Sequence, residues 1–306
     1  MTNEPTGWIP PFMRTSEQSE NDERILAGLP RFAMPGYRDE TGRFALWDIA
    51  KKVNGGQHIP FAWQVTGSCV GSGGSNMLRI LMRVEMSQGE AEEFQELWWP
   101  YTYGQSRKRG GMGGQGEGSF GSAWAEAIQK DGIFSVKESP GLPAFKDASG
   151  WLQLSRAVEM DWSDGASKSS FAPLGLKHPV KTVSKINNSS EAKASIQNGY
   201  PLTCASMMGT RGPRLQGTPE VQLAAWDDEW AHQMSVNEAW DHPTLGLIFR
   251  IQNNWGPNAH PDDPSGAPPG GFYVTAKTFD RICRDEVFAF SGFDGFPTQN
   301  LDWSNT

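Results

Sequence analysis

The hydrophobic pattern of this 306-residue chain changes about halfway along its length, and this change restricts the folds open to it. After Cys69, the apolar residues Met77, Leu78, Leu81 and Val84 recur at helical spacing. In the second half, short β-branched and aromatic runs predict strands at 180–186, 202–207, 232–239, 247–252 and 272–275. We therefore expect an α+β fold with a helical N-terminal half, a β-rich, barrel-like C-terminal half, and an active site in the cleft between them.

Further helices are predicted over residues 90–107, 123–130 and 190–198. Gly89 and Asp131-Gly132 are plausible helix ends. The one compact basic run, Arg107-Lys108-Arg109, is interpreted as a solvated loop. It therefore does not indicate a nucleic-acid site.

The domain organisation follows from shifts in composition. Residues 1–44 are rich in Pro, Asn, Ser and charged residues, which predicts an extended N-terminal arm or a pro-segment. Residues 45–295 form the predicted domain, with a helical half at about 64–150 and a strand-rich half at about 176–295. Residues 296–306 are expected to form a C-terminal tail.

Charge and cysteine content exclude several classes of protein. A formal charge of −8, from 27 basic and 35 acidic side chains, does not favour a nucleic-acid partner. No run approaches the roughly 18 apolar residues of a membrane helix, and the N-terminus lacks a signal-peptide pattern. Three cysteines argue against a disulfide framework and against a four-cysteine zinc site. We expect a cytoplasmic or virion-associated protein; the sequence does not indicate its oligomeric state.

One cysteine has the surroundings of a nucleophile. Cys69 lies in Gly67-Ser68-Cys69-Val70-Gly71, directly before the predicted helix. The positive end of a helix dipole lowers the pKa of a thiol, and small neighbours leave room for a substrate. A buried structural cysteine explains this segment equally well. Cys204 and Cys283 lie in apolar runs and are interpreted as structural.

A histidine and an asparagine in the second half complete a candidate site. His232 opens a predicted strand, whereas His178 and His260 adjoin prolines and are expected at the surface. Asn253 lies where another strand ends, and its amide oxygen can accept the second ring N–H of a histidine. Trp255 can shield that hydrogen bond from water. A core histidine and an asparagine turn cap remain the alternatives.

Together and in this order, these segments resemble the papain family of cysteine peptidases. The matching segments are Pro60-Phe61-Ala62-Trp63-Gln64, Gly67-Ser68-Cys69, Ala231-His232, Asn253-Asn254-Trp255-Gly256 and Gly270-Gly271-Phe272-Tyr273-Val274. The resemblance covers roughly residues 45–295 and is specific, because these segments agree with the family in type and order.

The resemblance implies a role for each residue. Cys69 would be the nucleophile, His232 the general base, and Asn253 the residue that orients the histidine. Gln64 would donate to the oxyanion together with the backbone N–H of Cys69. Gly121 and Ser122 would line the unprimed side of the substrate groove. No cofactor is implied.

The chain departs from the family pattern at several places. The spacing from Gln64 to Cys69 is one residue shorter than in plant and lysosomal members, and Val70 replaces the usual tryptophan. The family's disulfide cysteines are missing, and residues 257–269 form a Pro-rich insertion. His260, Asp262 and Asp263 in this insertion could suggest a metal, but such loops are usually solvated, and no metal is expected.

Three functions remain open from the sequence. The first is a thiol-dependent peptidase or amide hydrolase that acts on a peptide or protein through an acyl-enzyme. The second is a catalytically vestigial structural or binding component, for example of a virus particle. The third is a non-proteolytic amide hydrolase or a transferase that uses the same triad.

Overall fold

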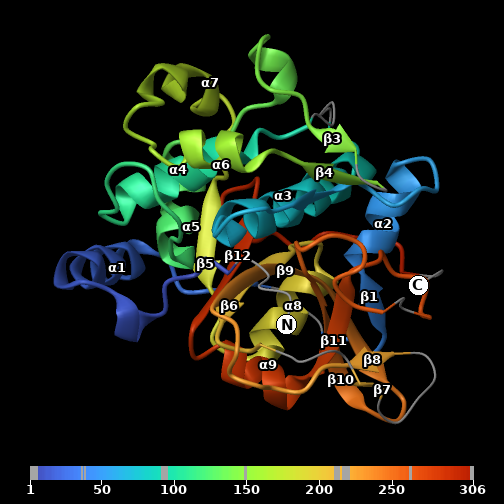
Figure 1. The fold of residues 1–306 in the computed structure, drawn as a ribbon. Helices are drawn as coiled ribbons and strands as arrows, with labels where there is room; N and C mark the ends of the chain where they lie inside the picture. Colours follow the sequence, from blue (N-terminus) through green and yellow to red (C-terminus); the bar gives the residue numbers. More distant parts are fainter. Residues whose placement is uncertain are drawn as a thin grey trace.

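The computed structural model describes residues 6–35, 37, 39–90, 96–147, 150–209, 214–215, 221–261 and 264–303. Its helices and strands separate into two regions, as the sequence predicts, and the α+β fold class is confirmed (Figure 1). Within the described ranges, no helix combines the length and apolar character needed to cross a lipid bilayer.

Most elements before residue 176 are helical. They are η1 (Pro11–Met13), α1 (Ser16–Gly28), β1 (Arg43–Ala45), α2 (Leu46–Val53), β2 (Phe61–Trp63), α3 (Cys69–Ser87), α4 (Trp99–Arg109), α5 (Gly121–Lys130), η2 (Val136–Glu138), β3 (Lys146–Asp147), β4 (Trp151–Gln153), α6 (Arg156–Trp162), η3 (Ser169–Phe171) and α7 (Ala172–Gly175). The strands β2, β4 and β3 form a small three-stranded sheet beside these helices.

Strands dominate the rest of the chain. The elements are β5 (Thr182–Lys185), α8 (Ser189–Gln197), β6 (Leu202–Ser206), β7 (Arg214–Leu215), β8 (Gln222–Leu223), β9 (His232–His242), β10 (Gly246–Gln252), β11 (Gly271–Thr275), α9 (Ala276–Ile282) and β12 (Glu286–Ser291). In the described part of the chain they form a nine-stranded sheet in the order β5-β12-β6-β9-β10-β11-β8-β7, with β1 added on β9. All five strands predicted in this half are confirmed.

The helix α3 connects the two regions because its first turns consist of small residues. A Cβ on Gly73 would lie 2.8 Å from the backbone oxygen of Gln233 in β9, and one on Gly74 would lie 2.2 Å from the Trp124 ring in α5. These glycines therefore let α3 approach the sheet and α5 at backbone distance. The helix ends at Ser87, and Gly89 follows with a φ of +90°, where a side chain would be strained.

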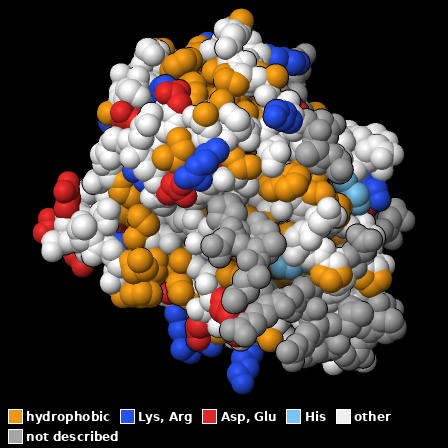
Figure 2. Space-filling view, in the orientation of Figure 1, with side chains coloured by type: hydrophobic (Ala, Val, Ile, Leu, Met, Phe, Trp, Pro, Cys, Tyr) orange, Lys and Arg blue, Asp and Glu red, His pale blue; other side chains and the backbone are white. Residues whose placement is uncertain are grey.

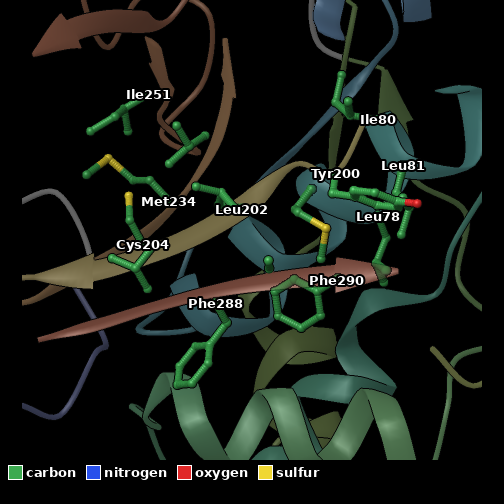
Figure 3. Packing of buried hydrophobic residues seen from close by; sticks show 14 of the residues in the cluster. Leu78, Ile80, Leu81, Tyr200, Leu202, Cys204, Met234, Ile251, Phe288 and Phe290 are labelled. Carbon is green, nitrogen blue, oxygen red and sulfur yellow. The ribbon is translucent and has the colours of Figure 1, made fainter. Parts of the chain in front are cut away.

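The main core fills the space between α3, α5 and the sheet. Leu78, Ile80 and Leu81 of α3 meet side chains from β6, β9 and β12 in one cluster (Figure 3). Trp124 of α5 packs edge-on against Phe290 of β12, with ring centroids 5.3 Å apart. Burial of these side chains joins the helical and strand-rich halves, because both packed faces are apolar and their exposure to water would be unfavourable.

Two local predictions were wrong. The helix expected over residues 90–107 begins only at Trp99, because Pro100 is well suited to a first helical turn; residues 91–95 lie outside the described part. The basic run at Arg107 forms the end of this helix rather than a solvated loop. The Arg107 side chain is buried and donates to the backbone oxygens of Ser163, Glu117 and Gly118.

The N-terminal segment is also more ordered than an extended arm. It contains the helix α1, which begins with a capping box between Thr15 and Gln18 and packs beside α5 (Figure 1). The exposed carboxylates of Glu17, Glu20 and Glu23 belong to this helix, and acidic side chains gather at the corresponding edge of the space-filling view (Figure 2). The boundaries at residues 44 and 295 stay predictions.

Candidate active site

Cys69 is the first residue of α3 and is fully buried. Two side chains from the strand-rich half donate to the backbone of the first two residues of α3. Asn254 Nδ2 donates to the Cys69 oxygen over 3.3 Å, and Gln233 Nε2 donates to the Val70 oxygen over 3.1 Å. These contacts hold the start of α3 against β9 and β10, so the thiol lies at the junction of the two halves.

The sheet topology brings His232 and Asn253 together at the same junction. His232 is the first residue of β9 and Asn253 follows the last residue of β10, and these two strands are antiparallel neighbours. His232 Nε2 lies 2.9 Å from Asn253 Oδ1. The ring of Trp255 stacks on the imidazole, with centroids 4.4 Å apart and planes 25° apart, and so covers the hydrogen bond.

The thiol and the imidazole are both buried and uncharged in this arrangement. Burial raises the pKa of Cys69 to about 12, against smaller lowering effects of the backbone N–H groups of Gln233, Gly7 and Val70. Burial lowers the pKa of His232 to about 4, against the hydrogen bonds of Asn253 and Asn254. Within the described residues His232 Nδ1 has no hydrogen-bond partner, so the thiol and the ring are not hydrogen bonded here.

The N-terminal segment covers the junction. The backbone N–H groups of Gly7 and Trp8 both donate to the oxygen of Ala231, the residue before His232. Ile9 N donates to Ser119 O over 2.7 Å, and Ser119 N donates to Gly7 O over 2.8 Å. Trp8 and Ser119 thus pair as a parallel bridge. Residues 7–9 therefore add a short strand-like segment between the two halves, directly over Cys69.

The segment is anchored by a carboxylate on β12. Glu286 accepts three hydrogen bonds: from Trp8 Nε1 over 2.6 Å, from Arg14 Nη2 over 2.8 Å and from Gly121 N over 2.6 Å. The Trp8 side chain is 2% exposed. Arg14 lies over the ring of Phe120, 4.3 Å from its centroid. Apolar burial and charge-assisted hydrogen bonds thus act together to hold the segment in place.

The segment also lies against the thiol. Burial raises the pKa of Cys69, and the Gly7 N–H acts weakly in the opposite direction. The Gly7 carbonyl accepts from Ser119 N, which fixes this residue in the cleft. Residue 7 therefore restricts access to the sulfur.

Gln64 lies near Cys69 but is engaged with its own loop. Its Nε2 donates to the Thr66 oxygen over 3.0 Å, and its Oε1 accepts from Ser72 Oγ over 3.4 Å. The residue is 1% exposed. Its backbone N donates to Asn254 O over 3.0 Å, which ties the loop before Cys69 to the segment that carries Asn253.

A buried carboxylate from α6 shapes this shortened loop. Glu159 accepts from the backbone N–H groups of Val65 and Thr66 and from the hydroxyls of Thr66 and Ser68. Burial raises the pKa of Glu159 to about 7, and these hydrogen bonds act in the opposite direction. Four donors on one acid therefore fix the backbone from residue 65 to residue 68, immediately before the nucleophile candidate.

Gly121 and Ser122, which the resemblance places along the substrate groove, bond to other parts of the chain. Gly121 donates to Glu286, and Ser122 donates to Asp22 of α1, whereas Ser119 pairs with the segment in the cleft. Their place in a substrate groove stays a prediction. Glu159 and Glu286 carried no recognisable local signal, because each acts on residues more than 90 positions away.

The burial of one histidine also differs from the prediction. His260, predicted at the surface, is only 4% exposed, whereas the His178 side chain is exposed as predicted. Asp262 and Asp263, considered with His260 as possible metal ligands, lie outside the described residues. Among the residues that are described, no group of three or more His, Cys, Asp or Glu side chains is arranged to hold a metal ion.

In Cys69→Ala, cleft opening is expected to become easier as the pH falls. This variant has no thiolate to pair with His232, so the imidazole should titrate near 6.5 in the opened cleft, whereas burial in the closed cleft lowers the pKa of His232 to about 4. The opened cleft therefore binds a proton that the closed one does not. The closed state is therefore fully favoured above pH 6.5 and loses stability as the pH falls toward 4. At pH 5 the loss amounts to about 2 kcal/mol, or roughly 30-fold in the opening equilibrium.

Hydrogen exchange measures this effect directly. Protection factors of the Trp8 and Ile9 amides in Cys69→Ala, corrected for intrinsic rates, should fall between pH 7 and pH 5. The drop should be much smaller in the double variant Cys69→Ala/His232→Gln, which cannot take up the proton. An equal drop in both proteins would show that another group controls opening.

No protein-family model matches the chain, and no curated protein matches it. Solved structures do. Xylellain, a cysteine protease from Xylella fastidiosa, is 15% identical, with a TM-score of 0.54 over 95% of this chain and 92% of that one. Procathepsin L 3 from Tenebrio molitor larval midgut is 9% identical (TM-score 0.54, 90% and 79% covered), and procathepsin B from Trypanosoma congolense is 10% identical (TM-score 0.54, 94% and 90% covered).

These matches define the class of fold. The matched structures are a cysteine protease and the precursors procathepsin L 3 and procathepsin B, and each aligns with most of this chain. The chain therefore has a papain-like peptidase fold, as the resemblance of its motifs predicted.

Proposed function

We propose that this chain is a thiol-dependent peptidase or amide hydrolase, and that its N-terminal segment holds it in a latent state. The observation that carries the proposal is the 2.9 Å contact between His232 Nε2 and Asn253 Oδ1 at the start of α3, where Cys69 lies. The papain-like fold supports it. The proposed substrate is a peptide or protein, and the reaction requires no cofactor.

The proposed reaction proceeds in two steps. Cys69 transfers its proton to His232 Nδ1, and the thiolate attacks the carbonyl carbon of an amide. The tetrahedral oxyanion is held by the Cys69 N–H and by Gln64, and it collapses as His232 protonates the leaving amine. His232 then takes a proton from water, and the resulting hydroxide releases the acyl group as a carboxylic acid, which regenerates the thiol.

Asn253 supplies orientation in this scheme. Its oxygen accepts the N–H at Nε2 of His232, so the proton-accepting nitrogen of the neutral ring is Nδ1, the atom left for the thiol. Trp255 covers this hydrogen bond and excludes water from it. Without that acceptor the ring can adopt either tautomer, and only one of them can accept the thiol proton.

Latency explains why both reacting groups are neutral in this structure. Residues 7–9 exclude solvent from the cleft, and burial opposes the charged forms of Cys69 and His232. Once the segment leaves, water returns and the thiolate–imidazolium pair can form, because each charge then stabilises the other.

A peptidyl vinyl sulfone, which alkylates only an activated thiol, tests the proposal. In chains whose cleft has been opened by substitution in the segment, mass spectrometry should find the adduct on Cys69 and not on the buried Cys204 or Cys283. Peptide hydrolysis should accompany labelling and be absent in Cys69→Ala. Product analysis separates hydrolysis from acyl transfer to an added amine.

One outcome would favour the structural or binding alternative. If iodoacetamide alkylates Cys69 in the opened chain, the thiol is accessible. A chain that is accessible in this way, but neither reacts with the vinyl sulfone nor hydrolyses any member of a peptide library, has the fold without the activity.

A further inference from the structure

A second histidine lies behind the proposed triad. His260 belongs to the Pro-rich loop between β10 and β11 and is 4% exposed. Its Nε2 lies 3.0 Å from Nδ2 of Asn253. The Asn253 amide is thus held from both sides, by His232 at its oxygen and by His260 at its nitrogen.

The direction of these hydrogen bonds follows from a backbone group. The N–H of Asn254 lies 2.7 Å from Asn253 Oδ1, and a backbone N–H can only donate. That atom must therefore be the amide oxygen, and the opposite atom must be the NH2 group. The NH2 group faces His260 Nε2, so His260 Nε2 must be an unprotonated acceptor.

We propose that His260 is a positioning residue, which accepts the Asn253 amide N–H and thereby keeps the amide oxygen directed at His232. This inference deepens the proposed function and rests on it. If Asn253 turned by 180° about its last bond, its NH2 group would face His232 Nε2, and the ring would lose the acceptor that selects its tautomer.

The surroundings of His260 keep it neutral, as this role requires. Its ring packs edge-on against Phe272 of β11 (centroids 4.7 Å) and lies near Trp230 (6.2 Å). Burial lowers the pKa of His260 to about 3, and the positive charge of Arg250 acts in the same direction, as would a proton on His232. A protonated His260 would place an N–H group against the Asn253 amide hydrogens.

Substitutions of His260 distinguish a positioning role from a purely structural one. If His260 only fills space beside Phe272, then phenylalanine should replace it without loss, since the ring volume is similar. If His260 acts as an acceptor, phenylalanine should fail, and glutamine should recover most of the function because its side-chain oxygen can accept the same N–H.

Nitrogen-15 NMR of the wild-type chain tests the proposal without requiring activity. The resonances of His260 are assigned by their loss in His260→Gln. We expect a neutral ring with the proton on Nδ1 and an unprotonated Nε2 between pH 5 and 8. An Nε2–H tautomer would overturn the proposal, whether or not the chain is an enzyme. The expected tautomer in a chain without turnover would leave this inference intact and count against the proposed function.

Kinetics of the opened chain provide the second readout. His260→Phe should lower kcat/KM by roughly 10- to 100-fold, as is typical when the partner that orients a functional ligand is removed. KM should change little, and the acidic limb of the pH profile should move. His260→Gln should restore both properties. A His260→Phe chain with wild-type kcat and pH profile would overturn the inference.

His242→Phe is the matched control for loss of a buried imidazole. His242 is 5% exposed and packs against Trp240, but it ends the strand that His232 begins. At about 3.3 Å per residue, the strand length between the two histidines is roughly 30 Å, so His242 lies at the opposite end of β9 from the site. It should leave the tautomer of His260 and the pH profile unchanged.

Discussion

Replacing Gln64 by alanine is expected to lower kcat by about 10²–10³-fold in the opened chain and to leave KM nearly unchanged, because an oxyanion-hole donor acts mainly on the transition state. The Gln64 side chain is buried beside Cys69, and its Nε2 donates to the Thr66 oxygen in the closed arrangement. Glu159 fixes the backbone of the loop that follows, so the Gln64 side chain alone has to turn from the Thr66 oxygen to present an N–H to the oxyanion.

Steady-state kinetics with a peptide substrate, alongside circular dichroism, measures this effect. Gln105→Ala is the matched control, because Gln105 is also buried and donates to a backbone oxygen, that of Gly165. It should change stability without a selective loss of kcat. Near-normal turnover of Gln64→Ala would remove Gln64 from the site and leave the oxyanion to backbone N–H groups alone.

The second large effect is expected from a single methyl group. In Gly7→Ala the new Cβ would lie 2.0 Å from the Gly67 oxygen and 2.3 Å from the Gly67 carbonyl carbon. Both are backbone atoms beside the Cys69 loop, so no side-chain rotation relieves the clash. Overpacking of this kind costs about 1–3 kcal/mol, which corresponds to roughly 5- to 150-fold more of the open state.

Alkylation of Cys69 by iodoacetamide in the full-length chain reports this change. Gly28→Ala is the control, since Gly28 lies in the same N-terminal segment and a Cβ there meets nothing within 4 Å. In Gly28→Ala, iodoacetamide should alkylate Cys69 at the wild-type rate. If Gly7→Ala labels no faster than wild type while the Ile9 amide stays protected from exchange, residues 7–9 do not restrict access to the thiol.

These two variants also separate latency from chemistry. Gly7→Ala should raise thiol accessibility and turnover together, whereas Gln64→Ala should lower turnover without changing accessibility. Combining them should give an accessible thiol with low turnover. A chain that opens and remains inactive with Gln64 intact would instead support the structural or binding alternative.

The fold and the candidate triad could be predicted from local patterns. Apolar spacing after Cys69 determined the helix that carries it, and alternating runs determined the strands that begin at His232 and end before Asn253. Helical and strand periodicities depend on neighbouring residues and on the burial of one face, so a short stretch of sequence is enough to predict them. The order of the motifs then indicated the papain-like fold.

Only the tertiary structure decided what surrounds those residues. The sequence of the N-terminal segment does not show that Gly7 meets Gly67 or that Trp8 reaches Glu286, because these contacts join residues 60 and 278 positions apart. The proline beside His260 predicts a surface position for this histidine, yet the loop folds back and buries it against Asn253. Burial and long-range hydrogen bonding set the charge state of the thiol and the imidazole, and both depend on which distant segments share the cleft.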